Sequence, residues 1–420
     1  MINIVSSQDP YINEEWNKIL GSQLVNDGYS VFPMDDGNYT ILGETSSSWE
    51  GGYDLLFMKV DKIGNIIKEA SFGGPEDNSF ECAEKSADSN FLVVCDYNLR
   101  LIKLDSSGNI LWDKTLKNDL RVSHSIRSTK DGGFIITGRG SRYYPKYTQD
   151  LFLSKVDSEG NLEWEKFYGG PLGDDGFSVD ETSDGGYIIV GQTQLNANSY
   201  SSWMIKTDSD GNKLWENSNS GCDYIEETSD GGFITTCFGL IKTDSLGNVI
   251  WTDSESLGEY VHEVHEVKNG YVAQGHNWLA IIDSNGKTLL NKSIIGPDGY
   301  ISDIRSFNFA NDGGLILTGH SYAQDGSNNK KVWLIKIGPI YDQKCNKIGD
   351  LNIEDLERDL GIVSGQHDCF FKDSFQLLIL FLDDPKLHLY PDVPRVKLIL
   401  YDRNAKTFST DRQKAIDLYY

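Results

Sequence analysis

The segment from Leu151 to Gly191, LFLSKVDSEGNLEWEKFYGGPLGDDGFSVDETSDGGYIIVG, contains one whole structural period of this chain. It holds two turns with glycine, at residues 157–161 and 184–186, each between short runs rich in β-branched and aromatic residues. Glycine supplies the positive φ that such turns need, and the pattern is typical of β-hairpins. Less regular copies of this segment recur from near the N-terminus to about residue 340. The chain is therefore organised by an internal repeat.

The number of repeats decides the fold. The first turn occurs seven times, at residues 36–38, 88–90, 131–133, 184–186, 230–232, 269–270 and 312–314. The second turn occurs six times, beginning at Asp61, Asp105, Asp157, Asp208, Asp244 and Asp283. A spacing of roughly 40 to 50 residues is the period of a four-stranded propeller blade. The count predicts an all-β, seven-bladed β-propeller over residues 11–340.

The seventh copy of the second turn is missing after Trp333, and its strand is found at the other end of the chain. Residues 15–21, EWNKILG, read like residues 163–169, EWEKFYG. We therefore predict that the N-terminal strand completes the last blade and closes the ring, which leaves no open sheet edge.

A tryptophan follows the second turn in most repeats. We expect this position to pack between neighbouring sheets, and it is occupied by Trp16, Trp112, Trp164, Trp215 and Trp251. Lys68 and Leu290 replace the tryptophan in two repeats, which predicts that those two blades are the least firmly docked.

The repeat stops at Tyr341. Residues 350–360 have an amphipathic helical pattern, residues 374–382 are a continuous apolar run that fits a helix or a buried strand, and residues 395–401 read as a strand. Residues 410–420 read as a capped terminal helix. We predict a small α+β domain over residues 341–420.

The formal charge of −25 argues against nucleic acid and against an anionic membrane surface as partners. No run of about 18 apolar residues is present, so we expect no membrane insertion. The N-terminus lacks the pattern of a signal peptide, which predicts a cytoplasmic protein if the chain is taken literally. An exported protein whose signal peptide had been removed would look the same. We expect a monomer that binds a neutral or cationic partner, if it binds one.

The repeats resemble those of bacterial and archaeal propeller proteins with the pattern DGGYIIxG…WLIKTDxxGNxxWxKxxGG. Residues 184–191, DGGYIIVG, and residues 203–212, WMIKTDSDGN, match this pattern. More distantly, Asp-x-x-Gly-x-x-x-Trp is similar to the tryptophan-docking motif of quinoprotein propellers. The resemblance implies a propeller and a scaffold or binding module. Members of the closer family are mostly exported and generally lack an assigned activity, so the resemblance carries over no catalytic residues and no cofactor.

One strand position is polar and varied in six of the seven repeats, unlike a structural position. It lies four residues before each first turn, on the innermost strand, and holds Phe32, Glu84, Arg127, Asp180, Glu226, His265 and Asn308. Propellers bind ligands near the channel mouth, where inner-strand residues from several blades converge. We hypothesise that these residues form a binding site. The alternative is a water-filled polar channel.

Metal sites are poorly supported. Asp208 and Asp210 are spaced like the start of a calcium loop, but position 12 of such a loop is Asn219, and an Asp that opens a turn usually accepts backbone N–H bonds. His262 and His265 lie three apart on a predicted strand, where they would point to opposite faces, so we expect no zinc site. We predict no metal and no cofactor.

The cysteines leave two alternatives open. Cys82 and Cys95 are placed symmetrically about one first turn, and Cys222 and Cys237 about another, so each pair could form a disulfide across a hairpin. Buried thiols explain the same pattern in a reducing compartment.

No nucleophile motif such as Gly-x-Ser-x-Gly is present, and no adjacent Cys-Cys pair of the kind expected in a pyrroloquinoline-quinone dehydrogenase. The leading prediction is a non-catalytic binding or scaffolding module that recognises protein or carbohydrate through one face of the propeller. The alternative is a hydrolase or lyase with acidic residues at the channel mouth, which carboxylates with divergent pKa values would favour.

Overall fold

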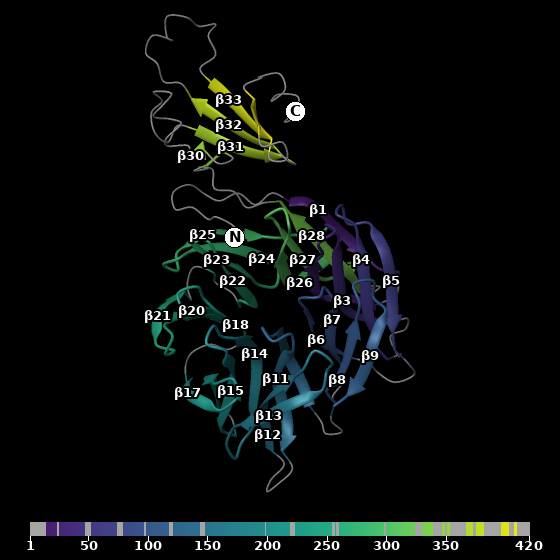
Figure 1. Ribbon diagram of the computed structural model, residues 1–420, viewed down its shortest axis with the longest axis vertical. Coiled ribbons are helices and arrows are strands. Elements are labelled where there is room, and N and C mark those ends of the chain that lie inside the picture. The colour runs from purple at the N-terminus through teal and green to yellow at the C-terminus, as the bar shows by residue number, and fades with distance from the viewer. Residues whose placement is uncertain are drawn as a thin grey trace, which may run out of the picture. The chain divides into compact units, whose positions relative to one another are not determined.

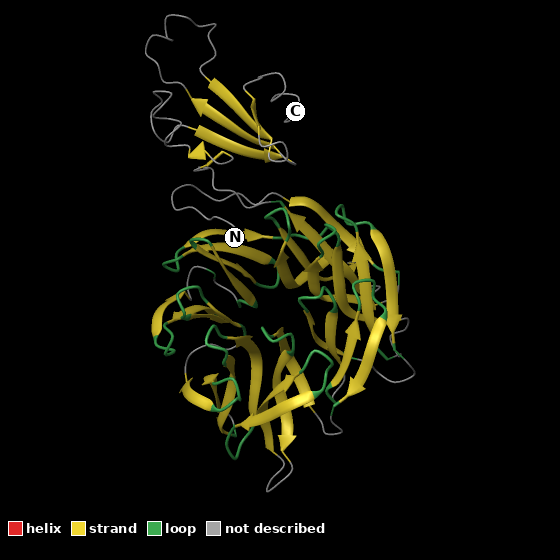
Figure 2. Cartoon of the chain, in the orientation of Figure 1, coloured by secondary structure: helices red, strands yellow, loops and turns green. Residues whose placement is uncertain are grey.

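The computed structural model shows a chain built from β-strands, with no helix in the part that it describes (Figure 2). The residues described are 14–22, 25–46, 52–73, 79–95, 98–116, 121–142, 148–197, 199–218, 223–253, 257, 260–297, 300–323, 330–338, 347–348, 351–352, 367–372, 375–381, 396–402 and 407–409. These ranges contain no helix able to span a membrane. The chain divides into two compact units, residues 12–340 and residues 341–420, with short N-terminal segments assigned to each.

The first unit consists of antiparallel sheets, most of them formed by four strands that follow one another along the chain. The first two repeats contain β2 (Val25–Pro33), β3 (Tyr39–Ser46), β4 (Asp54–Val60) and β5 (Ile66–Phe72), then β6 (Phe80–Lys85), β7 (Phe91–Cys95), β8 (Arg100–Leu104) and β9 (Ile110–Thr115). The next three contain β10 (Arg121–Ser128), β11 (Phe134–Arg142), β12 (Thr148–Val156) and β13 (Leu162–Tyr168), then β14 (Asp174–Glu181), β15 (Tyr187–Asn196), β16 (Ser199–Thr207) and β17 (Lys213–Ser218), then β18 (Ile225–Glu227), β19 (Phe233–Cys237), β20 (Gly239–Thr243) and β21 (Val249–Asp253). The last two contain β22 (Glu263–Val267), β23 (Gly270–Gln274), β24 (Trp278–Asp283) and β25 (Thr288–Ser293), then β26 (Tyr300–Phe309), β27 (Leu315–Ala323) and β28 (Lys330–Ile337).

Within this unit the sheets are arranged around a common centre, with first strands such as β14, β18 and β22 inside and fourth strands such as β5, β17 and β21 at the rim (Figure 1). The buried cores lie between adjacent sheets. One such core joins Ile135, Leu151 and Val179 from the sheets β10–β13 and β14–β17. Packing between sheets, rather than a single central core, therefore holds the unit together.

The first turn of most repeats is fixed by an aspartate; the turn at residues 269–270 has Asn269 and Gly270 instead. In the turn after β14, Gly185 has φ +82°. The Asp184 carboxylate accepts hydrogen bonds from Thr182 Oγ1 at 2.6 Å, the Gly186 N–H at 3.0 Å and Lys206 Nζ at 3.0 Å. The Lys206 side chain is buried, so the aspartate also supplies the counter-charge that a buried ammonium needs. Equivalent contacts form at Asp131 and Asp230.

The second turn is also closed by its first aspartate. At Asp208, Oδ1 accepts the backbone N–H groups of Asp210 and Asn212 at 3.0 and 2.7 Å, and Oδ2 accepts Asn212 Nδ2 at 3.0 Å. Both carboxylate oxygens therefore accept hydrogen bonds within the turn, as predicted for an aspartate that opens a turn. The same bonds occur at Asp61, Asp105, Asp157 and Asp244.

Each tryptophan after a second turn contacts the second turn of the next sheet. Gly160 lies so close to Trp112 that a Cβ on it would come within 2.3 Å of the indole, and Gly211 stands in the same relation to Trp164 at 2.7 Å. The Trp164 ring also lies 5.8 Å from the Tyr187 ring of the following sheet. Positive φ and lack of space together require glycine here. The tryptophans thus pack between sheets.

Lys68 replaces the tryptophan in the sheet β2–β5. Its Nζ donates to the Ser107 carbonyl at 2.7 Å, and the Phe57 ring occupies the space against Gly108. This interface therefore has a polar contact and a different aromatic ring. Weaker docking of the two sheets that lack the tryptophan stays a prediction.

The N-terminal strand β1 (Glu14–Leu20) pairs antiparallel with β28, with Trp16 opposite Lys336 and Ile19 opposite Trp333. Figure 1 shows the two strands side by side, although they lie at opposite ends of the repeat region. The Asn17 side chain accepts a hydrogen bond from Trp333 Nε1 at 2.8 Å. One parallel pair, Val25 with Lys330, joins β28 to β2. The last repeat thus receives its outer strand from the N-terminal segment.

The second unit contains β29 (Lys347–Ile348), β30 (Leu351–Asn352), β31 (His367–Lys372), β32 (Phe375–Phe381), β33 (Val396–Asp402) and β34 (Thr407–Ser409). The last four form an antiparallel sheet in the order β31-β32-β33-β34. Within the apolar run predicted at 374–382, residues 375–381 are a strand, and residues 396–401 of the segment predicted as a strand at 395–401 are one too. The start of the helix predicted at 350–360 instead forms β30, because Leu351 pairs with Ile348. The rest of that segment and the helix predicted at 410–420 lie outside the described residues.

Candidate functional site

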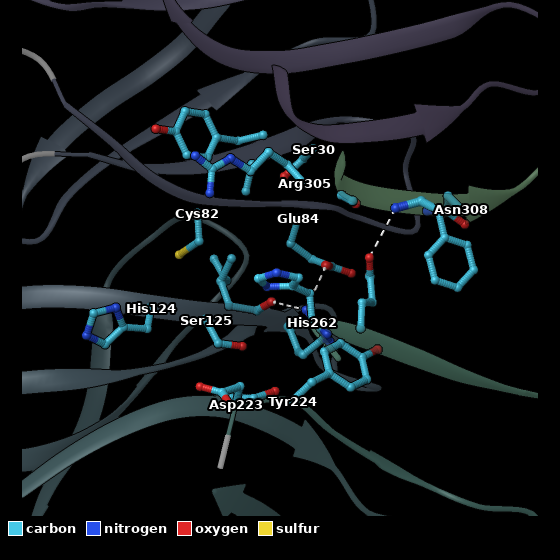
Figure 3. A pocket seen from close by; sticks show the side chains of 18 of the residues that line it. Ser30, Cys82, Glu84, His124, Ser125, Asp223, Tyr224, His262, Arg305 and Asn308 are labelled. Atoms are coloured by element: carbon cyan, nitrogen blue, oxygen red, sulfur yellow. Dashed lines mark hydrogen bonds and ion pairs between the residues drawn. The ribbon is translucent and has the colours of Figure 1, made fainter. Parts of the chain in front are cut away.

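A cavity of about 490 Å³ lies where the first strands of the sheets converge. Its wall is built from β2, β6, β10, β14, β18, β22 and β26, or from residues directly before them. Figure 3 shows side chains from several of these strands, including Glu84, Asp223, His262 and Asn308, gathered around one space.

The structure brings all the residues of the variable strand position together. We call them the inner ring, and it consists of Phe32, Glu84, Arg127, Asp180, Glu226, His265 and Asn308, which all line the cavity. These residues therefore face one common space. That they form a binding site stays a prediction.

Sequence reasoning missed a second ring. We call it the bulge ring, and it consists of Tyr29, Glu81, His124, Phe177, Asp223, His262 and Arg305, which line the same cavity. Each member lies three residues before an inner-ring residue. The signal that could have found it is this constant offset, combined with side chains as varied as those of the inner ring.

A β-bulge explains why residues three apart face the same side. The register between β14 and β15 shifts between Gly176 and Ser178, so Phe177 is an extra residue. A bulge breaks the alternation of a strand and redirects the side chains around it. Similar shifts occur at Tyr29, Glu81, His124 and Arg305.

The expectation that His262 and His265 point to opposite faces is therefore wrong. The His262 N–H and Glu263 both pair with Gln274, so the regular alternation begins only after His262. Both histidines line the cavity. Within the described ranges, no three His, Cys, Asp or Glu side chains are grouped as metal ligands would be.

His265 is the centre of a charged network. Its Nδ1 lies 2.7 Å from Glu226 Oε2, and its Nε2 lies 3.1 Å from Glu263 Oε1. Burial opposes the charge of the ring, but the hydrogen bonds to the two carboxylates raise the pKa of His265 to about 10. The ring is therefore an imidazolium at neutral pH, and it holds both glutamates in place.

Arg127 forms a second set of contacts across the inner ring. Its guanidinium lies 5.5 Å from the centre of the Tyr224 ring and 3.9 Å from Glu84 Oε2. Glu84 also accepts a hydrogen bond from Ser128 Oγ at 3.2 Å. Burial raises the pKa of Glu84, and the nearby Arg127 opposes that shift.

Asp180 is an inner-ring carboxylate held by the backbone of the next sheet. Its Oδ2 accepts the backbone N–H of Glu227 at 3.0 Å. Burial raises the pKa of Asp180 to about 6, although the Glu227 N–H and Arg127 favour the charged form. Asp180 is therefore a cavity acceptor that gains a proton under mildly acidic conditions.

The bulge ring contains polar atoms without partners. Within the part of the chain that the structure describes, His262 Nε2 and Asp223 Oδ2 are buried atoms with no hydrogen bond. Burial and the neighbouring His276 ring lower the pKa of His262 to about 4, so this imidazole is neutral. Buried polar atoms usually have a partner, and those that lack one call for an explanation.

The charge of the cavity wall is mainly negative. The carboxylates are those of Glu81, Glu84, Asp180, Asp223, Glu226 and Glu263, and the guanidinium groups are those of Arg127 and Arg305. Even with the His265 imidazolium, carboxylates outnumber cations. The cavity therefore disfavours anions.

The cysteine predictions have two outcomes. Cys82 and Cys95 are thiols, so the possible disulfide between them is wrong. The bulge places Cys82 opposite Val94, while Cys95 pairs with Phe80. Cys237 is disulfide-bonded, and its predicted partner Cys222 lies outside the described residues.

Known proteins resemble this chain in fold only. No family model matches the chain, and no curated protein matches it. Among solved structures, the Dos1 propeller matches 77% of this chain and 95% of its own at 12% identity, with a TM-score of 0.50. A catalytically inactive variant of virginiamycin B lyase from Staphylococcus aureus, with quinupristin, matches 77% of this chain and 99% of its own at 13% identity and TM-score 0.54. Selenomethionine-substituted virginiamycin B lyase from the same organism matches the same shares at 14% identity and TM-score 0.53. At such identities the likeness concerns the fold alone, and this chain is similar to propeller-type repeat proteins.

Proposed function

We propose that this protein is a non-catalytic binding module that takes a carbohydrate into its central cavity. The observation that carries the proposal is the pair of rings, because both arrange varied side chains from every repeat around one cavity. Ligand cavities of proteins have a few hundred Å³ and combine apolar walls with a few well-placed polar groups.

The chemistry of the wall suits a polyhydroxylated ligand. Carboxylate oxygens accept hydrogen bonds from hydroxyl groups, and such charge-assisted bonds are strong. The aromatic side chains of Tyr29, Phe80, Phe177 and Tyr224 also line the cavity, and they offer apolar surfaces to the C–H faces of a sugar ring. Because carboxylates are in excess, a neutral or cationic sugar fits better than an anionic one.

Most ionisable side chains of the inner ring already form ion pairs or hydrogen bonds with neighbouring side chains. Glu226 and Glu263 flank His265, and Glu84 contacts Arg127 and Ser128. Groups fixed in this way are preorganised for binding and are poorly placed to exchange protons with a substrate. This favours recognition over catalysis.

A glycan array tests the proposal. We expect the protein to retain neutral or amino-sugar glycans and to ignore polyanionic ones. Asp180→Asn removes a charged acceptor from the cavity and should weaken the best glycan by about tenfold or more. The matched control is Asp210→Asn, an exposed turn residue of the same sheet, which should leave binding unchanged. Retention of a protein ligand instead of any glycan would replace carbohydrate by protein as the partner.

A lyase or hydrolase is the second candidate, favoured by one observation. The cavity wall holds Asp180, whose pKa is raised to about 6, and His262, whose pKa is lowered to about 4. A carboxylic acid and a neutral imidazole with such divergent pKa values are suited to general acid and base roles. Incubating the protein with the glycans that it retains, followed by mass spectrometry, distinguishes the candidates. Unchanged glycans support the binder, and cleaved products support the enzyme.

We also propose that the sheets of residues 11–340 form a seven-bladed propeller closed by β1. The support is the pairing of β1 with β28 and the contact of Trp16 with Gly64, where a Cβ would lie 3.0 Å from the indole. A closed ring protects the edges of its sheets. We propose residues 341–420 as a separate small domain, and a monomer as the assembled state.

A further inference from the structure

We propose that the ligand is an oligosaccharide longer than the cavity, and that its emerging units stack on an aromatic ledge formed by His262, Tyr260 and Phe238. This inference rests on the proposed function and adds the direction and the length of the ligand. The ledge begins in the cavity wall, because His262 belongs to the bulge ring.

The three rings form a continuous series. The rings of His262 and Tyr260 are 5.2 Å apart at an interplanar angle of 66°, and those of Tyr260 and Phe238 are 5.7 Å apart at 82°. Each pair has the edge-to-face geometry that aromatic rings prefer. The exposed fraction of Phe238 is 77%, so the series ends in solvent.

Among the described residues, Phe238 belongs to neither of the hydrophobic cores that its sheet forms with its neighbours. It forms the connection between β19 and β20, where Cys237 pairs directly with Gly239. A tight connection of this kind is usually made by small polar residues. Phe238 is the exposed end of a ring series that starts in the cavity wall, and on this continuity we base its binding role.

The ledge is held in place before any ligand arrives. Cys237, next to Phe238, is disulfide-bonded, and its carbonyl accepts the Val261 N–H at 3.4 Å. Tyr260 forms a hydrogen bond to Asp223, a cavity residue. Rigid aromatic side chains bind with little loss of conformational entropy.

The polar atoms without partners lie at the cavity end of the same ledge. His262 Nε2 belongs to the first ring of the ledge, and Asp223 Oδ2 belongs to the carboxylate that Tyr260 contacts. A sugar unit in the cavity would lie against the His262 side of the wall, and the next unit of the chain would reach Tyr260 and Phe238. The ledge therefore marks the side on which a long ligand leaves the cavity.

The test is isothermal titration calorimetry with N-acetylglucosamine oligomers of one to six units as the neutral probe, and glucosamine oligomers of the same lengths as the cationic probe. We expect affinity to rise by about fivefold from the dimer to the tetramer in the series that binds, the gain typical of one added aromatic contact. Phe238→Ala should remove that gain and leave the monomer and dimer affinities unchanged. Phe238→Trp should restore it.

Leu246→Ala is the matched control, because Leu246 is 66% exposed and follows β20 at the end opposite to Phe238. It should change no affinity. Equal affinities for dimer and tetramer, or a tetramer affinity that Phe238→Ala leaves intact, overturn the ledge and leave the cavity proposal standing. Failure of both sugar series at every length, together with a glycan array on which no glycan is retained, overturns the proposed function and the ledge with it.

Discussion

Trp16 donates its indole N–H to the carbonyl oxygen of Lys62 at 3.2 Å, and this bond joins the N-terminal strand to the second turn of the sheet β2–β5. The same indole lies 6.2 Å from the Tyr39 ring. Trp16 therefore packs against the second turn of the next sheet, as Trp112 and Trp164 do in later sheets. It fastens β1 and β28 to the sheet that begins the chain's repeats.

Trp16→Ala should lower the free energy of unfolding by about 2–3 kcal/mol, less than for a fully buried tryptophan because Trp16 is half-buried. The measurement is urea unfolding followed by fluorescence. Leu214→Ala is the control, since Leu214 is 59% exposed on β17, and it should change stability by less than about 0.5 kcal/mol. Equal, small effects for both variants would show that the N-terminal strand is not needed to fasten the sheets.

Stability should fall between pH 6.5 and pH 10 because of His265. The folded pKa of His265 is about 10 against 6.5 for the unfolded chain. A raised pKa contributes stability that is complete below 6.5 and is lost as the pH rises through 10, with a slope of at most about 1.4 kcal/mol per pH unit. His265→Gln should flatten this slope, whereas His276→Gln, on an exposed histidine, should keep it. A slope unaffected by His265→Gln would mean that the glutamate network does not hold the proton.

Asp180→Asn should make the protein more stable at neutral pH while weakening ligand binding. The folded pKa of Asp180 is raised to about 6, so the charged form destabilises the fold, and stability falls as the pH rises from 4 to 6. The amide removes this penalty, which predicts a gain of about 1–2 kcal/mol at pH 7. Thermal unfolding at pH 4 and pH 7 measures it. A loss of stability at pH 7 would assign Asp180 a structural role.

The Asp184–Lys206 pair allows a double-mutant test of the turn. Although burial works against it, hydrogen bonds from Thr182, the Gly186 N–H and Lys206 lower the pKa of Asp184 to about 2. Asp184→Ala leaves the buried Lys206 without its carboxylate and should cost about 2–3 kcal/mol. Lys206→Met should cost less, and the double variant should be no worse than Asp184→Ala alone. Additive losses in urea unfolding would show that the two side chains act independently.

The sequence was sufficient for the features that depend on local chemistry. Asp-Gly-Gly turns between β-branched runs require hairpins, and the likeness between residues 15–21 and 163–169 predicted the strand that pairs with β28. The inner ring was also predictable, because a strand position that varies in polarity while its neighbours stay apolar must face something other than the core.

The remaining features depend on register, which the sequence does not display. The bulges add one residue to most first strands, and this places Phe177 in the cavity wall and Cys82 opposite Val94 rather than Cys95. Nothing local in those residues signals the shift. The segment at 351–352 similarly forms a strand because of a pairing that its amphipathic pattern hides.

The most direct test of the account is a crystal structure of the protein with the oligosaccharide that it binds most tightly in the glycan array. We predict a sugar unit in the central cavity, within hydrogen-bonding distance of Asp180 and of His262 Nε2, with the chain leaving toward Phe238. An oligosaccharide bound on the outer strands, with the cavity filled only by water, would contradict it.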